Sequence, residues 1–124
     1  MALPNAYGQY NSSKILTASP AELTLMLYEG AIKFCNIAIA AIDNKDVEKA
    51  HIHIQKIERI IDYLRQTLDM KYPVAEHFER IYTYLSQRLI EANVKKDREI
   101  LEEVNGHLRM LRDTWKEVMR TGRG

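Results

Sequence analysis

Apolar residues recur at spacings of three or four positions in three stretches of the chain. In residues 47–68 the repeat consists of Val47, Ala50, Ile54, Ile57, Ile61, Leu64 and Leu68. Residues 74–92 and 101–118 carry equivalent repeats, which begin at Val74 and Leu101. This spacing puts the apolar side chains of each stretch on one face of an α-helix. The pattern therefore predicts three amphipathic helices, the last of them capped by Asp97.

A fourth helix is predicted ahead of these three, beginning at Pro20. Ser19 is placed to cap its free amides, and Glu22 reaches back to complete a capping box. Pro20 suits the first helical position because the amide hydrogen that it lacks is not needed there. We expect this helix to run to about Ile42, where residues 43–46 offer a stop and N-cap candidates for the next helix.

The helix predicted over residues 20–42 carries two apolar stripes instead of one. The first consists of Leu23, Leu27, Ala31, Phe34, Ala38 and Ala41. The second consists of Leu25, Tyr28, Ile32, Cys35, Ile39 and Ile42. Together they cover more than half of the circumference, so we expect the first to face a bundle core and the second to lie outside it. An exposed apolar surface of this kind calls for a cover or a binding partner.

The three connections between the predicted helices are short, about four or five residues each. Connections of this length make consecutive helices antiparallel. We therefore predict an all-α fold, an antiparallel up-down-up-down four-helix bundle within a single domain over residues 1–124. Residues 1–18 form an N-terminal cap segment or short helix, residues 19–120 the bundle, and residues 121–124 a frayed tail.

Composition and charge narrow the function. The chain has 18 Lys and Arg against 17 Asp and Glu, well mixed, which gives no footprint for nucleic acid. The single cysteine, Cys35, cannot form an internal disulfide. No phosphate-binding glycine loop or Gly-x-Ser-x-Gly motif occurs, so we expect no enzyme activity and no cofactor. The N-terminus lacks the features of a secretory signal, which favours the cytosol.

Two alternative interpretations of the pattern are a membrane span and a metal site. Residues 23–42 are about long enough to span a bilayer, but Glu29, Lys33 and Asn36 share one face, which favours a buried helix without membrane insertion. Glu48 and His51 have the spacing of a di-iron ligand pair, yet the inward positions of the other helices are apolar, so no metal site is expected. A metal-dependent oxidase remains an alternative that elemental analysis would test.

A binding surface and its cover are the candidate functional elements. The predicted groove beside the helix over residues 20–42 consists of Leu25, Met26, Tyr28, Ile32 and Ile39. The predicted N-terminal cap residues are Tyr7, Tyr10, Ile15 and Leu16. The segment that carries them is either a plain ordered cap or a mobile one that a partner displaces. A self-associating structural bundle, with the second stripe buried against a second copy, is the alternative function.

Several motifs resemble those of a known family. They include Thr17-Ala18-Ser19-Pro20, Leu25-Met26-Leu27-Tyr28-Glu29-Gly30-Ala31 and Leu111-Arg112-Asp113-Thr114-Trp115. In this combination and order the chain resembles the FliS-type flagellar secretion chaperones. The resemblance implies a cytosolic, ATP-independent chaperone that binds the C-terminal segment of flagellin. Such a chaperone prevents premature polymerisation and aids delivery to the flagellar export apparatus, with export-gate or other flagellar proteins as further partners.

Overall fold

The computed structural model describes residues 17–122, and over this range the chain forms four α-helices. They are α2 (Pro20–Asp43), α3 (Val47–Gln66), α4 (Ala75–Lys95) and α5 (Arg98–Arg120). All four predicted helices are confirmed, with ends within three residues of those expected. The predicted cap residues Tyr7, Tyr10, Ile15 and Leu16 lie outside the described residues, as do the last two residues of the predicted tail.

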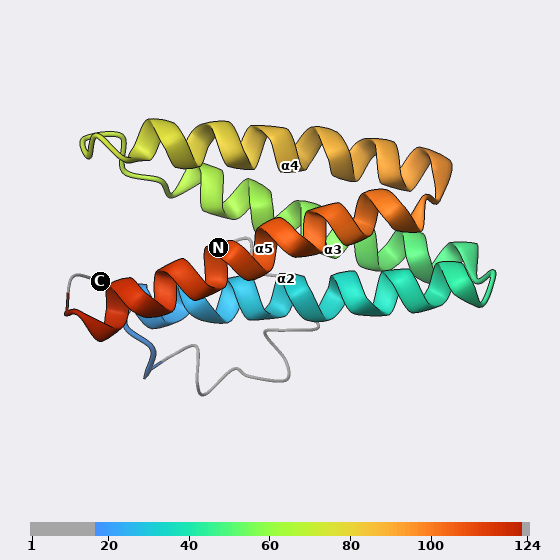
Figure 1. The fold of residues 1–124 in the computed structure, drawn as a ribbon, viewed down its shortest axis with the longest axis horizontal. Helices are drawn as coiled ribbons and strands as arrows, with labels where there is room; N and C mark the ends of the chain where they lie inside the picture. Colours follow the sequence, from blue (N-terminus) through green and yellow to red (C-terminus); the bar gives the residue numbers. More distant parts are fainter. Residues whose placement is uncertain (1–16, 123–124) are drawn as a thin grey trace.

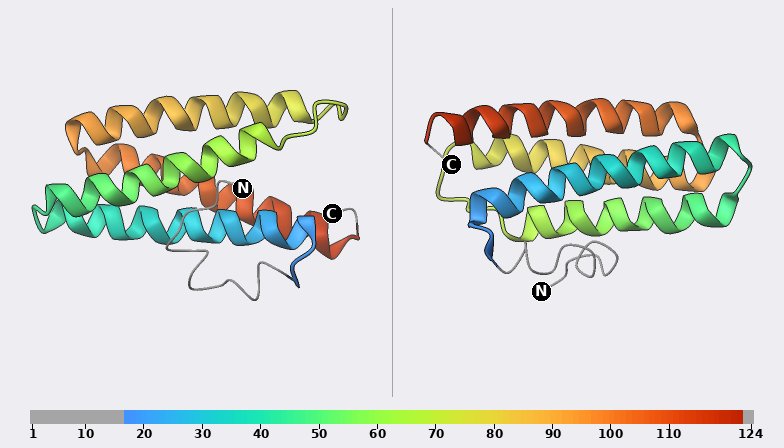
Figure 2. Two further views of the ribbon diagram at one scale, coloured as in Figure 1. Left: turned by 180° about the vertical axis from the view of Figure 1, so that it is seen from behind. Right: turned by 90° about the horizontal axis from the view of Figure 1, so that it is seen from below.

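Consecutive helices run in opposite directions along one common axis (Figure 1). Helix α2 packs against α3 and α5, and α4 packs against the same two helices on the other side. The four helices therefore form a ring in which α2 and α4 are diagonal neighbours, as the two further views show (Figure 2). The predicted all-α bundle is confirmed, and each helix in it faces two neighbours.

Side-chain caps fix the start of three helices. Ser19 Oγ accepts a hydrogen bond from the Glu22 amide at 3.2 Å, and Glu22 Oε1 accepts one from the Ser19 amide at 2.8 Å. The bond from the Ser19 amide lowers the pKa of the Glu22 carboxyl, because it favours the charged form. Asp46 caps α3 through the Lys49 amide, at 3.1 Å. The predicted cap of α5 is present as well, since Asp97 accepts from the amides of the first turn.

The core lies along the bundle axis and is built from the predicted seams. Its fully buried large side chains include Leu27, Ile54, Ile57, Ile61, Leu85, Leu89, Leu101 and Leu108. Val47 and Val74 were predicted as seam residues but are exposed, because they lie at the first turn of α3 and at the N-cap of α4. Ile60 and Tyr82 are buried although they lie outside the predicted seams. The burial of Ile60 and Tyr82 follows from the ring arrangement, in which a helix turns more than one stripe toward its neighbours.

Helix α2 is long and apolar enough, by length and composition, to cross a membrane. In the structure, however, half of its most apolar 18-residue window is buried inside the bundle. Burial of this kind is typical of the core helix of a bundle. Glu22, Glu29, Lys33 and Asn36 of this helix are exposed.

Candidate functional site

The second apolar stripe of α2 does not lie outside the bundle. Tyr28 is 1% exposed, Ile32 is 7% exposed and Cys35 is fully buried, and all three belong to the core cluster. The expectation that this stripe forms an open apolar groove is therefore wrong for Tyr28 and Ile32. The described bundle itself covers the middle of the stripe.

Helix α2 needs both stripes because it is packed between two helices. The first stripe faces α3, where the ring centroids of Phe34 and His53 lie 6.0 Å apart and Lys56 Nζ lies 5.3 Å above the Phe34 ring. The second faces α5, where Cys35 Sγ donates a hydrogen bond to the Leu101 carbonyl at 3.2 Å. An apolar surface over more than half of the helix is thus explained by two neighbours within the same bundle.

Two tyrosine hydroxyls meet inside the bundle. Tyr28 on α2 and Tyr82 on the diagonal helix α4 share a hydrogen bond of 2.6 Å between their hydroxyl oxygens. Burial raises the pKa of both phenols, because it disfavours the charged phenolate. Both also line a small pocket of about 180 Å³ at the end of the bundle, beside Trp115. The indole Nε1 of Trp115 donates to the Ala21 carbonyl at 2.8 Å, which ties the last turns of α5 to the start of α2.

Three predicted groove residues remain outside the innermost core. Leu25 and Ile39 are half-buried, and Met26 is 9% exposed. Ile39 lines an open groove between α2 and α5, which we call the α2–α5 groove. The groove has a volume of about 350 Å³ and is lined by Asn36, Ile39, Glu102, Asn105, Gly106 and Arg109. Of the five predicted residues, the structure places Ile39 in a groove of this kind.

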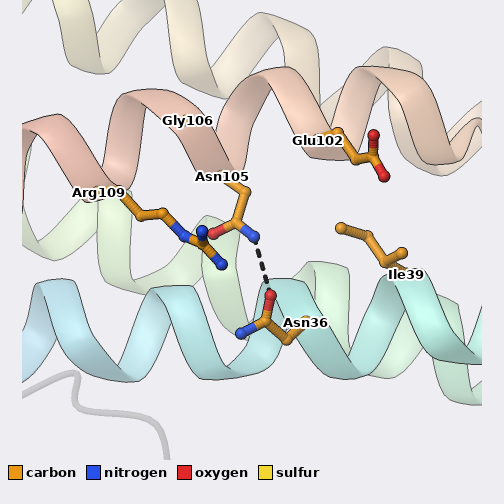
Figure 3. Close-up of a pocket in the computed structure, with 6 residues that line it drawn as sticks. All are labelled: Asn36, Ile39, Glu102, Asn105, Gly106 and Arg109. Atoms are coloured by element: carbon orange, nitrogen blue, oxygen red, sulfur yellow. Dashed lines mark hydrogen bonds between the residues drawn. The ribbon is translucent and has the colours of Figure 1, made fainter.

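An amide pair bridges the α2–α5 groove. Asn105 Nδ2 on α5 donates to Asn36 Oδ1 on α2 at 2.9 Å, and Figure 3 shows this bond crossing between the two helices. Asn105 is 7% exposed, whereas Asn36 is exposed. The Oδ1 atom of Asn105 is buried and has no hydrogen-bond partner among the described residues. A buried acceptor in this state is unusual, because leaving it unpaired costs about 1–3 kcal/mol.

Opposite charges flank the amide pair. Arg98 bridges Asp43 at the end of α2, with Nε to Oδ1 at 2.7 Å and Nη2 to Oδ2 at 3.0 Å, and it also contacts Glu102. Glu102 is thereby paired at one rim of the groove. At the other rim Arg109 is exposed and forms no ion pair or hydrogen bond within residues 17–122. The groove therefore combines one apolar side chain, Ile39, with hydrogen-bond donors and acceptors and with charges of both signs.

The Cys35 thiol and the possible metal ligands were the remaining candidates for reactive groups in the described part of the chain. Burial raises the pKa of Cys35 to about 12, which keeps the thiol protonated and a poor nucleophile. Within residues 17–122, no group of three or more His, Cys, Asp or Glu residues is arranged to hold a metal ion. His51 of the proposed ligand pair instead hydrogen-bonds Asn93, with its ring nitrogen Nδ1 2.9 Å from Asn93 Nδ2.

The sequence did not reveal Asn105, Gly106 and Arg109 as groove residues. The charge pattern predicts a solvated face for Arg109, and it is indeed exposed. The signal that was missed is the polar Asn105 beside the apolar seam of α5, at a position that the helix turns toward α2. Recognising this signal requires knowing how α2 and α5 are aligned, because the contacting residues Asn36 and Asn105 are 69 positions apart in the chain.

These features define a four-helix bundle with an open, partly polar groove between its first and last described helices. Comparison with known proteins shows to which family of such bundles the chain belongs. The model of the family "Flagellar protein FliS" matches residues 3–122. The chain therefore belongs to the FliS family of flagellar secretion chaperones, which confirms the resemblance carried by its motifs.

Three relatives illustrate the similarity, each of them a flagellar secretion chaperone FliS. The Bacillus subtilis protein is 38% identical over 123 residues, which cover 99% of this chain and 92% of the relative. The Campylobacter jejuni protein is 33% identical over 91% of this chain and 90% of its own length. The Salmonella typhimurium protein is 32% identical over 91% of this chain and 87% of its own length.

Proposed function

We propose that this protein is a cytosolic, non-enzymatic export chaperone that binds the C-terminal segment of flagellin without ATP. Binding would keep flagellin from polymerising early and aid its delivery to the flagellar export apparatus. The observation that carries the proposal is membership of the FliS family over residues 3–122. Export-gate or other flagellar proteins are proposed as further partners.

Such a chaperone acts by covering the apolar surface of its client. A filament-forming segment that is unpaired and poorly ordered is prone to aggregate, and burying its apolar side chains prevents this without any nucleotide. A helical client would place its anchors at positions i, i+3, i+4 and i+7 in a groove. Ordering the client costs several kcal/mol, so extensive burial is required.

The α2–α5 groove and the half-buried apolar residues of α2 support this role. Leu25 and Ile39 are half-buried on α2 and 14 positions apart, which corresponds to about 21 Å along the helix axis. A client helix of about four turns would span both. We propose that direct client contacts fall on Leu25, Met26 and Ile39. Tyr28 and Ile32 would act from the core by holding α2 in place.

The N-terminal segment is proposed as the competing cover. Its apolar residues Tyr7, Tyr10, Ile15 and Leu16 directly precede α2 in the chain. A covalently attached cover acts at high effective concentration, so it would protect the surface of α2 until flagellin displaces it. Under this proposal the covered and the client-bound states exclude each other.

Ile39→Asp is expected to weaken binding of the flagellin C-terminal segment by about tenfold. The substitution removes an apolar contact and places a carboxylate where the client would bury it, at a cost of about 1–2 kcal/mol because the site stays partly hydrated. Isothermal titration calorimetry with a peptide of that segment measures the change. The bundle should stay folded, because Ile39 is half-buried at the edge of the core.

Val47→Asp provides the matched control. It makes the same kind of change at an exposed apolar residue in the first turn of α3. An aspartate there suits the helix N-terminus, so neither stability nor peptide affinity should fall. Equal loss of affinity in both variants, or no loss in Ile39→Asp, would contradict the assignment of the client to α2.

A further inference from the structure

The α2–α5 groove contains a set of polar groups that the bundle does not satisfy. Asn105 Oδ1 is a buried acceptor without a partner among the described residues. Asn36 uses its Oδ1 to accept from Asn105, which leaves its Nδ2 without a partner in residues 17–122. Figure 3 shows the guanidinium of Arg109 on the same side of the amide pair as Asn105 Oδ1. One acceptor and two donors thus face one groove.

One acceptor and two donors in the same groove favour a neutral ligand group that has both a donor and an acceptor. An anion would suit Arg109 but would leave the Asn105 oxygen facing another acceptor. A cation would be repelled by Arg109, and Glu102 at the other rim is already paired with Arg98. A carboxamide fits, because its NH₂ donates to Asn105 Oδ1 while its oxygen accepts from Asn36 Nδ2 or Arg109.

Gly106 provides a second, independent observation that points to a ligand in the α2–α5 groove. It lies in the interior of α5, where glycine costs about 1 kcal/mol relative to alanine. A Cβ atom built at Gly106 meets no atom within 4 Å, so packing within the bundle does not require glycine there. Gly106 also lines the α2–α5 groove. A ligand that lies close to the α5 backbone at this point would explain both the glycine and the open space.

We propose that the α2–α5 groove recognises an Asn or Gln side chain of the bound client segment through Asn105, Asn36 and Arg109. The main-chain amides of a helical client are paired within the client, so its side-chain carboxamides are the free groups of this chemistry. The inference rests on the proposed function, because the client is the flagellin segment. It adds the polar contact that would fix the position of the client along α2.

The first variant is Asn105→Leu, studied in the full chain with the flagellin C-terminal peptide. Peptide affinity is expected to fall about tenfold. The melting temperature is expected to stay the same or rise, because an apolar group of similar size replaces an unpaired buried oxygen. Binding and stability would then change in opposite directions, whereas a purely structural role of Asn105 predicts a loss of stability. Unchanged affinity would overturn the proposal.

Gly106→Leu is the second variant and does not alter the buried amide. Gly106 is exposed and a Cβ atom there has open space in the free protein, so the melting temperature should rise by a few degrees as helix propensity improves. It would occupy the groove mouth, and peptide affinity should fall at least tenfold. Thr114→Leu, at an exposed position on the same helix away from the groove, is the control and should bind like the parent. Full affinity in Gly106→Leu would contradict the proposal.

The source of the carboxamide is tested with a second peptide, in which every Asn and Gln is replaced by Ala. The parent protein should bind this peptide about tenfold more weakly, and Asn105→Leu should cause no further loss. An equal effect of Asn105→Leu on both peptides would point to main-chain recognition and overturn the inference. Failure of the parent protein to bind either peptide would instead refute the proposed function, so the two failures are distinguishable.

Discussion

Ile32→Asp is expected to lower the free energy of unfolding by at least about 3 kcal/mol. Ile32 is 7% exposed and belongs to the core cluster, on the side of α2 that α5 covers. The substitution removes most of an isoleucine's burial and puts a carboxylate in an apolar setting, where an unpaired charge is strongly disfavoured. For a domain of this size that loss is a large share of the total stability. Urea unfolding followed by circular dichroism measures it.

Ala40→Asp is the matched control on the same helix. Ala40 is exposed, so the same charge there should cost less than about 1 kcal/mol through helix propensity and the helix dipole. Similar stability of Ile32→Asp and Ala40→Asp would show that Ile32 faces solvent, as the stripe pattern alone predicts. Because Ile32→Asp is expected to damage the fold, Ile39 is the better position for testing client binding.

The hydroxyl pair of Tyr28 and Tyr82 is expected to show strong thermodynamic coupling. Tyr28→Phe or Tyr82→Phe alone leaves the other hydroxyl buried without its 2.6 Å partner, at a cost of about 1–3 kcal/mol. The double variant removes both polar groups together and should cost clearly less than the sum of the two single changes. Urea unfolding of the four proteins in the double-mutant cycle measures the coupling, expected at about 1 kcal/mol or more.

The outcome of this cycle also reports on the small pocket beside the two tyrosines. Additive effects of the single changes would mean that each hydroxyl finds an equally good partner, such as water, in the pocket that both residues line. In that case the contact between the diagonal helices α2 and α4 would contribute little to stability. Both substitutions keep the aromatic ring and its packing, so a cavity effect is excluded as the cause.

The local features of the fold were predictable from the sequence because they depend on neighbouring residues. The capping box of Ser19 and Glu22 and the N-cap at Asp97 appear in the structure as expected. Most seam residues of α3 and α5 are buried, as is the second half of the seam of α4. Caps and periodicity involve residues within one or two helical turns, so no knowledge of tertiary contacts is needed.

The sequence pattern does not predict which neighbouring helices cover the second apolar stripe of α2. Periodicity shows that a helix face is apolar, but it does not show which neighbour covers that face. The pattern therefore assigns Tyr28 and Ile32 to an open groove, although α4 and α5 contact this side of α2. The pairing of Asn36 with Asn105 likewise depends on how two distant helices align. The structure thus moves the candidate binding surface from a broad apolar stripe to a narrower, partly polar groove.

Light scattering on mixtures of this chain with monomeric flagellin tests the central claim most directly. Without added nucleotide, the chain should bind intact flagellin as a complex of one copy each. Flagellin truncated by its C-terminal segment should leave the chain unbound. Absence of a complex with intact flagellin, or a chain that stays a dimer of itself in every mixture, would contradict the account and favour a self-associating structural bundle.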